Sequence, residues 1–214
     1  LLYLGKKKIK IKHIYYLDNE IIEDINFDYQ QVIQQIANLF KITPIEIKPL
    51  RLPFEFNLEH LQKMFKRIQG YEAWKNYGNW VTSHRNFLGS DIAAHFEYAA
   101  GVRNDTKLLI DYQQQHKFSS FLTHLLGEDS LLLLPTTVSV APAKSLSFST
   151  IEKLRTKTQY LTSIAGVAGT PQLVVPLQKG GQDFSLSIIA NRNTDNYLLQ
   201  QTSLIFKAIN KMSR

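Results

Sequence analysis

The chain has 214 residues, 44% of them hydrophobic, and this composition supports one domain with a buried core. Its net charge of +7 comes from scattered lysines and arginines that are not interleaved with aromatic residues, which disfavours nucleic-acid binding. Without cysteine, the chain can form no disulfide, no thiolate metal site and no cysteine nucleophile. No apolar run approaches the roughly 20 residues of a membrane span, and the first residues do not follow the order of a signal peptide.

The N-terminal part is predicted to form a strand, a helix and a second strand. We interpret the lysine-rich run at 6–12 as a solvated entry to the first strand, in preference to a phosphate-binding or membrane-surface patch. The strand covers 13–17, and apolar positions at 32–40 mark one face of a helix that begins near Asp28. Residues 45–47 alternate as the second strand, which we expect to end at a proline. The short connections predict a parallel pair with a right-handed crossover.

A long helix is predicted next. Asn57 is placed to cap it, apolar positions at 58–68 follow a spacing of three and four, and Gly78 is expected to loosen its end. Its second half is crowded with aromatic residues, which suit an apolar pocket or plain core packing equally well. These are Tyr71, Trp74, Tyr77 and Trp80.

Two more helices are predicted after a loop at 83–89. Ser90 or Asp91 is expected to cap the first, and the second covers 106–126. The predicted apolar face of this second helix consists of Leu109, Tyr112, Phe118, Phe121, Leu122 and Leu125.

Four consecutive leucines at 131–134 predict a central strand that is covered on both faces. The strand ends in Pro135 and two threonines, and ligands of open α/β sheets bind beyond such strand ends. The segment at 138–149 contains a proline and several serines and is predicted to be a surface loop.

The stretch at 162–190 is predicted to contain a helix end and a hairpin. Gly169 suits a left-handed C-cap, and residues 173–175 suit a strand that is buried on both faces. A Gly-Gly turn at 180–181 follows, and then a strand in which apolar residues alternate with Ser185 and Ser187. A last amphipathic helix begins near Thr194 or Asp195.

The run Ala-Gly-Val-Ala-Gly-Thr-Pro-Gln-Leu-Val-Val-Pro at 165–176, the hairpin and Asn191-Arg192 resemble the C-terminal signature of the amidase signature family. The resemblance extends more loosely from His13 to the C-terminus, and it is most pronounced for the branch of indoleacetamide amidases and amidase-like organelle docking receptors. It implies an α/β fold with a mixed β-sheet flanked by helices, as one domain over 1–214. Family members hydrolyse carboxamides with a Ser–cis-Ser–Lys triad in their N-terminal half, which these 214 residues do not contain.

The resemblance also implies where a substrate lies. A similar Leu-x-Pro-Thr loop is close to the substrate in the family, so Thr136 and Thr137 are expected to contact it; a simple cap on the strand end is the equal alternative. Tyr77 and Trp80 are also expected to bind the substrate, because the corresponding helix borders the family's substrate channel. No cofactor and no metal are expected. The expected partner is a small amide substrate once an N-terminal half completes the fold, and a homo-oligomer remains open.

No complete active site is predicted from these residues. No serine lies in a Gly-x-Ser-x-Gly elbow or a Gly-Ser-Ser-Gly loop, no nucleophile–base pair is recognisable, and the histidines lack metal-ligand spacing. Thr156 stands where tRNA-dependent amidotransferase subunits carry an acidic residue, which argues against transamidation. The leading hypothesis is the C-terminal portion of a hydrolase of carboxamide C–N bonds, inactive alone and cytoplasmic. The alternative is a catalytically inactive, amidase-like protein-interaction module.

Overall fold

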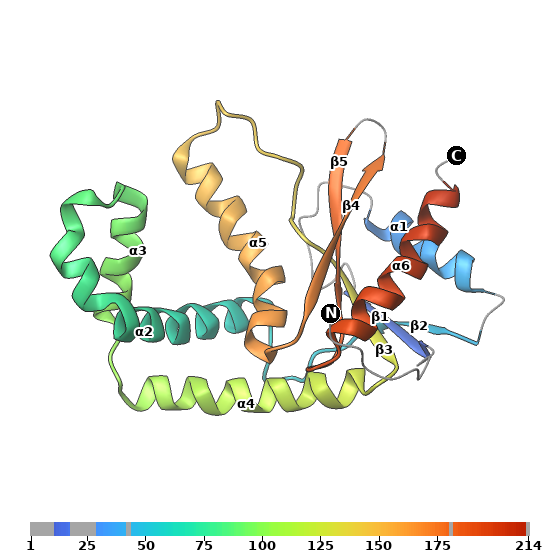
Figure 1. Ribbon diagram of the computed structural model, residues 1–214, viewed down its shortest axis with the longest axis horizontal. Helices are drawn as coiled ribbons and strands as arrows, with labels where there is room; N and C mark the ends of the chain where they lie inside the picture. Colours follow the sequence, from blue (N-terminus) through green and yellow to red (C-terminus); the bar gives the residue numbers. More distant parts are fainter. Residues whose placement is uncertain (1–10, 18–28, 42–43, 180–181, 213–214) are drawn as a thin grey trace.

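The computed structural model describes residues 11–17, 29–41, 44–179 and 182–212. Most of the lysine-rich run, the predicted helix start at Asp28 and the Gly-Gly turn at 180–181 lie outside the described residues. The elements, drawn in Figure 1, are β1 (His13–Leu17), α1 (Tyr29–Phe40), β2 (Glu46–Leu50), α2 (Leu58–His84), η2 (Arg85–Phe87), α3 (Ser90–Gly101), α4 (Thr106–Leu126), β3 (Ser130–Pro135), α5 (Phe148–Ala168), β4 (Gln172–Lys179), β5 (Gln182–Ile189) and α6 (Asp195–Met212).

The strands form one mixed sheet in the order β2-β1-β3-β5-β4. β2, β1 and β3 are parallel, and β5 runs antiparallel to both β3 and β4. The parallel pairing of the first two strands is therefore confirmed. β3 occupies the centre, and its four leucines are completely buried, as predicted for a strand covered on both faces.

Both edges of the sheet differ from the sequence prediction. β4 pairs only with β5 among the described strands, and Val174 is 48% exposed, so the expected burial of 173–175 on both faces is wrong. At the other edge, β2 continues through Pro49 instead of ending before it. Proline lacks the N–H that a ladder needs, and an edge strand has one side where this donor is not required.

α2 is longer and more regular than expected. Asn57 caps it as predicted, because its Oδ1 accepts a hydrogen bond of 2.8 Å from the backbone N–H of His60. Gly78 does not loosen the helix, which continues to His84. A Cβ atom at Gly78 would lie 2.9 Å from the Trp74 ring, so this glycine makes room for the indole.

The next two helices confirm the predicted positions but not every detail. Gly89, and not Ser90 or Asp91, occupies the N-cap position of α3. α4 has the predicted bounds and is capped by Asp105, whose carboxylate accepts from Leu108 N–H at 3.0 Å. On α4, Leu109 is 56% exposed and Leu108 is buried in its place, because the buried stripe begins one residue earlier.

The signature stretch has the predicted helix end. Gly169 adopts φ 65° and ψ 39°, the left-handed conformation that ends α5, and its N–H donates to the Ala165 carbonyl. The side-chain amide of Asn191 then ties the end of β5 to the end of α4, donating to the carbonyls of Gly127 at 2.7 Å and Thr123 at 3.3 Å.

The helices form two groups around the sheet. α2, α4 and α5 pack on one another, while α1 and α6 pack together on the other side of the molecule in Figure 1. α3 packs on α2 and, with the second half of α2, extends away from the sheet. This arrangement leaves two places to be considered as functional sites: the end of β3 and the space enclosed by α2, α3 and α5.

Candidate functional site

A polar cluster lies at the carboxyl end of the central strand. Ser187 on β5 is fully buried, and its Oγ lies 2.8 Å from Thr136 Oγ1 and 2.7 Å from Gln172 Nε2. The register explains this, because Leu134, Ser187 and Val174 are aligned across β3, β5 and β4. Residues two positions away on neighbouring strands share a face and are within reach. We call Thr136, Gln172 and Ser187 the β3-end cluster.

Ser187 and Gln172 were missed in the sequence. The alternation in β5 predicts that its serines are ordinary strand residues, but Ser187 lies on a strand between β3 and β4 and is buried. The signal that could have found it is a serine on a strand with apolar strands on both sides. Such a hydroxyl must find partners, because a buried polar group without them is costly.

The other three predicted site residues do not join the cluster. Thr137 is half-buried, and its hydroxyl donates to the Ser139 carbonyl at 2.8 Å, within its own loop. Tyr77 and Trp80 lie far along α2, 58% and 55% exposed, and the Trp80 ring stacks on His84 at 4.7 Å. α5 lies between the far half of α2 and the end of β3 in Figure 1. The structure therefore does not bring the two predicted pairs together.

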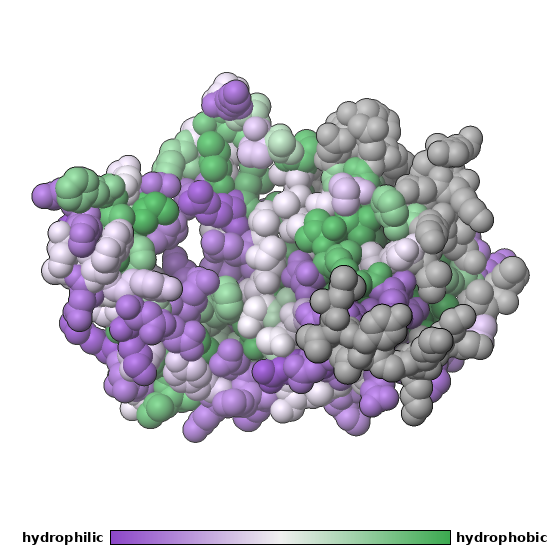
Figure 2. Space-filling view, viewed as in Figure 1, coloured by the Kyte–Doolittle hydropathy of each residue, from purple (hydrophilic) through white to green (hydrophobic). Residues whose placement is uncertain are grey.

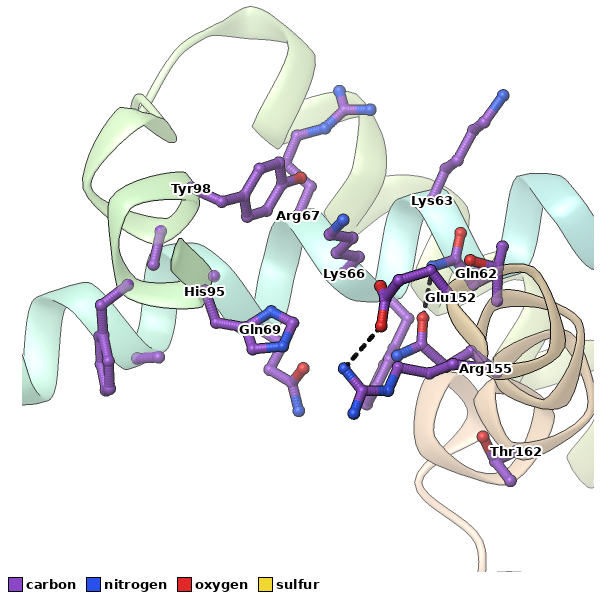
Figure 3. Close-up of a pocket in the computed structure, with 17 residues that line it drawn as sticks. Gln62, Lys63, Lys66, Arg67, Gln69, His95, Tyr98, Glu152, Arg155 and Thr162 are labelled. Carbon is purple, nitrogen blue, oxygen red and sulfur yellow. Dashed lines mark hydrogen bonds and ion pairs between the residues drawn. The ribbon is translucent and has the colours of Figure 1, made fainter. Parts of the chain in front are cut away.

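A cleft of about 810 Å³ lies between α2, α3 and α5. Figure 2 shows an opening at this position, edged by hydrophilic side chains, and Figure 3 shows the residues around it. Its lining comprises Gln62, Lys63, Phe65, Lys66, Arg67, Gln69, Gly70, Ala73, His95, Phe96, Tyr98, Ala99, Glu152, Arg155, Thr156, Gln159 and Thr162. Neither Tyr77 nor Trp80 belongs to it. The cleft could not be predicted from local sequence patterns, because the residues of its three walls are far apart along the chain.

Burial raises the pKa of several groups, and two of those that lie apart from the β3-end cluster are Asp111 and Tyr197. It raises the pKa of the Asp111 carboxyl, against the effect of Arg67, whose Nε lies 3.1 Å from Asp111 Oδ2. It also raises the pKa of the Tyr197 hydroxyl to about 12, with a smaller contribution from Asp129. Neither group is paired with a nucleophile, so neither defines an acid–base site.

One serine does lie beside a histidine, at the opposite end of β3. Ser130 Oγ is 3.5 Å from His13 Nδ1, and His13 Nε2 is 3.4 Å from Glu46 Oε2, because these residues are in register across the three parallel strands. The expectation that no such pair exists is therefore corrected. However, Ser130 is 3% exposed, so a substrate carbonyl cannot approach its hydroxyl. The aligned side chains of Ser130, His13 and Glu46 therefore belong to the sheet and do not form an acyl-transfer site.

The described part of the chain has neither a cluster of metal-binding side chains nor a membrane-spanning helix. No three histidine or carboxylate side chains there are close enough together to share a metal ion. None of the helices there is long and apolar enough to cross a membrane.

Comparison with known proteins shows distant relatives. No family model matches the chain. It is 26% identical over 160 residues to Amidase 1 of Oryza sativa subsp. japonica, and 23% identical over 159 residues to the mitochondrial outer envelope protein 64 of Arabidopsis thaliana. These matches cover 74% and 73% of this chain but 37% and 26% of the relatives. The chain is a distant relative of the amidase signature family.

Solved structures confirm the fold class. An amidase and a bacterial aryl acylamidase of the amidase signature family superpose with TM-scores of 0.72 and 0.65, both at 15% identity. The superpositions cover 91% and 94% of this chain, and 45% and 44% of those chains. The α/β fold with its five-stranded mixed sheet therefore matches part of the amidase signature structure. The chain spans less than half the length of each of these four proteins.

Proposed function

We propose that this chain is the C-terminal portion of an amidase signature hydrolase that cleaves carboxamide C–N bonds. In this proposal it forms part of the substrate pocket and supports it, and the catalytic residues come from the family's N-terminal half. The observation that carries the proposal is the β3-end cluster, which places polar side chains at the carboxyl end of a central parallel strand, where ligands of such sheets bind.

The hydrogen bonds of the cluster support a role for Thr136. The Ser187 hydroxyl accepts from Gln172 Nε2, and as a fully buried group it also needs an acceptor for its own proton. Thr136 Oγ1, at 2.8 Å, is that acceptor. The proton of the half-buried Thr136 hydroxyl is then free to be donated to another group. A substrate carbonyl oxygen is a suitable acceptor, because an amide presents an acceptor and, when it is unsubstituted, two donors.

Substitutions in the cluster test this role in a protein completed by co-expression with the N-terminal half of a relative. Thr136→Val keeps the size and removes the hydroxyl, and we expect kcat/KM for amides to fall by about 3- to 10-fold, the value of one hydrogen bond. Ser187→Ala should have a similar effect, because it removes the donor that orients Thr136. The ratio of rates for aryl and alkyl amides measures the change in preference, with Thr137→Val and Trp80→Ala in the same panel.

Thr82→Val, on an exposed turn of α2, is the control and should leave the rates unchanged. The role of Thr136 would be ruled out if its variant lowered the melting temperature while kcat/KM for every amide stayed at the wild-type value. In that case the threonine would only cap the strand.

The alternative function is an inactive interaction module. One observation favours it: large apolar side chains are exposed on the arm formed by α2, η2 and α3, with Phe87 at 85% exposure. Light scattering and an apolar dye separate the two functions. If the chain is a portion of an enzyme, we expect it to associate and to bind the dye when it is expressed alone, because the edge strand β4 and apolar surface are uncovered. A monodisperse monomer, whether or not its exposed arm binds the dye, would favour the module.

A further inference from the structure

The cleft between α2, α3 and α5 is a second site, separate from the β3-end cluster. Its shape is held by close helix contacts on two sides. A Cβ atom at Gly166 of α5 would lie 2.7 Å from the Phe65 ring of α2, and one at Gly70 of α2 would lie 3.2 Å from Tyr98 of α3. A hydrogen bond of 2.9 Å between Gln62 and Gln159 also joins α2 to α5. At about 810 Å³ the cleft is within the usual range of pockets for small molecules.

Positive charge predominates along the walls. Lys63, Lys66, Arg67 and Arg155 line the cleft, and Glu152 is the single acidic residue in the lining. Lys66 has no ion pair among the described residues, and its amino group lies 4.6 Å from the centre of the Tyr98 ring. Acidic residues pair with the other three cations, so within the described ranges Lys66 carries the unpaired positive charge that attracts an anion into the cleft.

Three basic side chains from the three helices extend into the same space. Figure 3 shows Lys66 of α2, His95 of α3 and Arg155 of α5 around the opening. Arg155 uses one nitrogen, Nη1, to pair with Glu152 at 3.0 Å, which leaves further N–H donors on its planar guanidinium. A guanidinium and an ammonium ion facing one space suit the oxygens of a carboxylate or a phosphate.

Uncharged polar side chains make up part of the remaining lining, and apolar side chains make up the rest. Phe65, Ala73, Phe96 and Tyr98 provide carbon surface beside the cations. Free inorganic ions gain nothing from such a surface, whereas an organic ion with an apolar body buries part of itself against it. We therefore propose that this cleft binds a small organic anion, whose carboxylate or phosphate group is held by Lys66 and Arg155 and whose apolar body lies against the aromatic wall.

Isothermal titration calorimetry on the full 214-residue chain, at constant ionic strength, tests the proposal with three probes. Benzoate and benzamide have nearly the same shape and differ in charge, and inorganic phosphate has charge without an apolar body. We expect benzoate to bind at least tenfold more tightly than either of the other two. Where light scattering shows that the chain associates, the complex with a co-expressed N-terminal half takes its place.

Variants then locate the binding. Lys66→Met and Arg155→Gln should each weaken benzoate binding by about tenfold or more, the usual effect of losing a charge-assisted hydrogen bond. Lys75→Met and Lys153→Met remove exposed charges from the same two helices outside the cleft and should change nothing. If Lys66→Met does not fold, the response of the His95 ring resonances to benzoate, absent with benzamide, supports the same conclusion.

Several results would overturn the proposal. Equal affinity for benzoate and benzamide would show that the charge is not recognised, and phosphate binding without benzoate binding would exclude the organic ligand. Equal losses in the Lys75 and Lys66 variants would mean that only the overall charge matters. No heat with any probe at about 10 mM, from a folded chain, would leave the cleft without an anion site.

Discussion

Replacing Leu132 by alanine is expected to lower the free energy of unfolding by about 3–5 kcal/mol. Leu132 is completely buried in β3, the central strand, with β1 on one side and β5 on the other. Strands on both sides are fixed by hydrogen bonds, so the sheet cannot close around the missing atoms and a cavity remains. Because domains are stable by only about 5–15 kcal/mol, this change should remove much of the folded population.

Chemical denaturation followed by circular dichroism measures the effect. Leu109→Ala on α4 is the matched control, since it deletes the same atoms from a side chain that is 56% exposed. We expect that control to cost less than about 1 kcal/mol. Comparable losses in the two variants would contradict the placement of β3 at the centre of the sheet.

The second large effect is expected at the ion pair of Arg67 and Asp111. Asp111 is buried, and the Arg67 side chain retains only 20% of its exposure. Asp111→Ala should lower the free energy of unfolding by about 3 kcal/mol, because it leaves a largely buried guanidinium without a counter-charge. The exposed pair Arg85–Glu97 is the control, and Glu97→Ala should cost below about 1 kcal/mol.

A double variant distinguishes the effect of the unpaired charge from the effect of lost packing. Arg67→Met with Asp111→Leu replaces both charges by apolar groups, and it should recover most of the stability lost in Asp111→Ala. If the double variant is as unstable as the single one, the loss comes from packing and not from the unpaired charge.

The same pair predicts a pH dependence. Burial raises the pKa of Asp111 above its ordinary value of 3.8, so the folded protein holds this proton more tightly than the unfolded chain does. The stabilisation that comes from this tighter proton binding is therefore complete below 3.8 and is lost as the pH rises through the raised pKa of the folded state. The difference in stability between wild type and the double variant should shift toward the variant over this interval.

The parts of the fold that could be predicted depend on neighbouring residues in the sequence. The four leucines define β3, and Asn57 and Gly169 mark helix ends by their own backbone preferences. The stretch at 165–176 carries the resemblance to the amidase signature family. Each of these signals is complete within a few residues. These features can therefore be predicted without knowing the order of the strands.

The predictions are wrong or incomplete where the burial of a residue depends on the order of the strands or on the packing of the helices. Val174 looks buried from its apolar neighbours, but β4 is an edge strand. Ser187 is predicted to be an ordinary strand residue from its alternation, but it lies on β5, between β3 and β4, and is buried. The cleft is formed by residues such as Lys66, His95 and Arg155 from three separate helices, and no local sequence pattern predicts that these residues lie close together.

We propose that this chain supports an amidase whose catalytic residues come from another part of the fold. The most direct test measures hydrolysis of a panel of aryl and alkyl amides by the purified chain, by the N-terminal half of a relative, and by the two co-expressed. We expect turnover only in the co-expressed sample, abolished by a serine-directed phosphonate. Turnover by the purified chain alone, abolished by the same phosphonate, would contradict it.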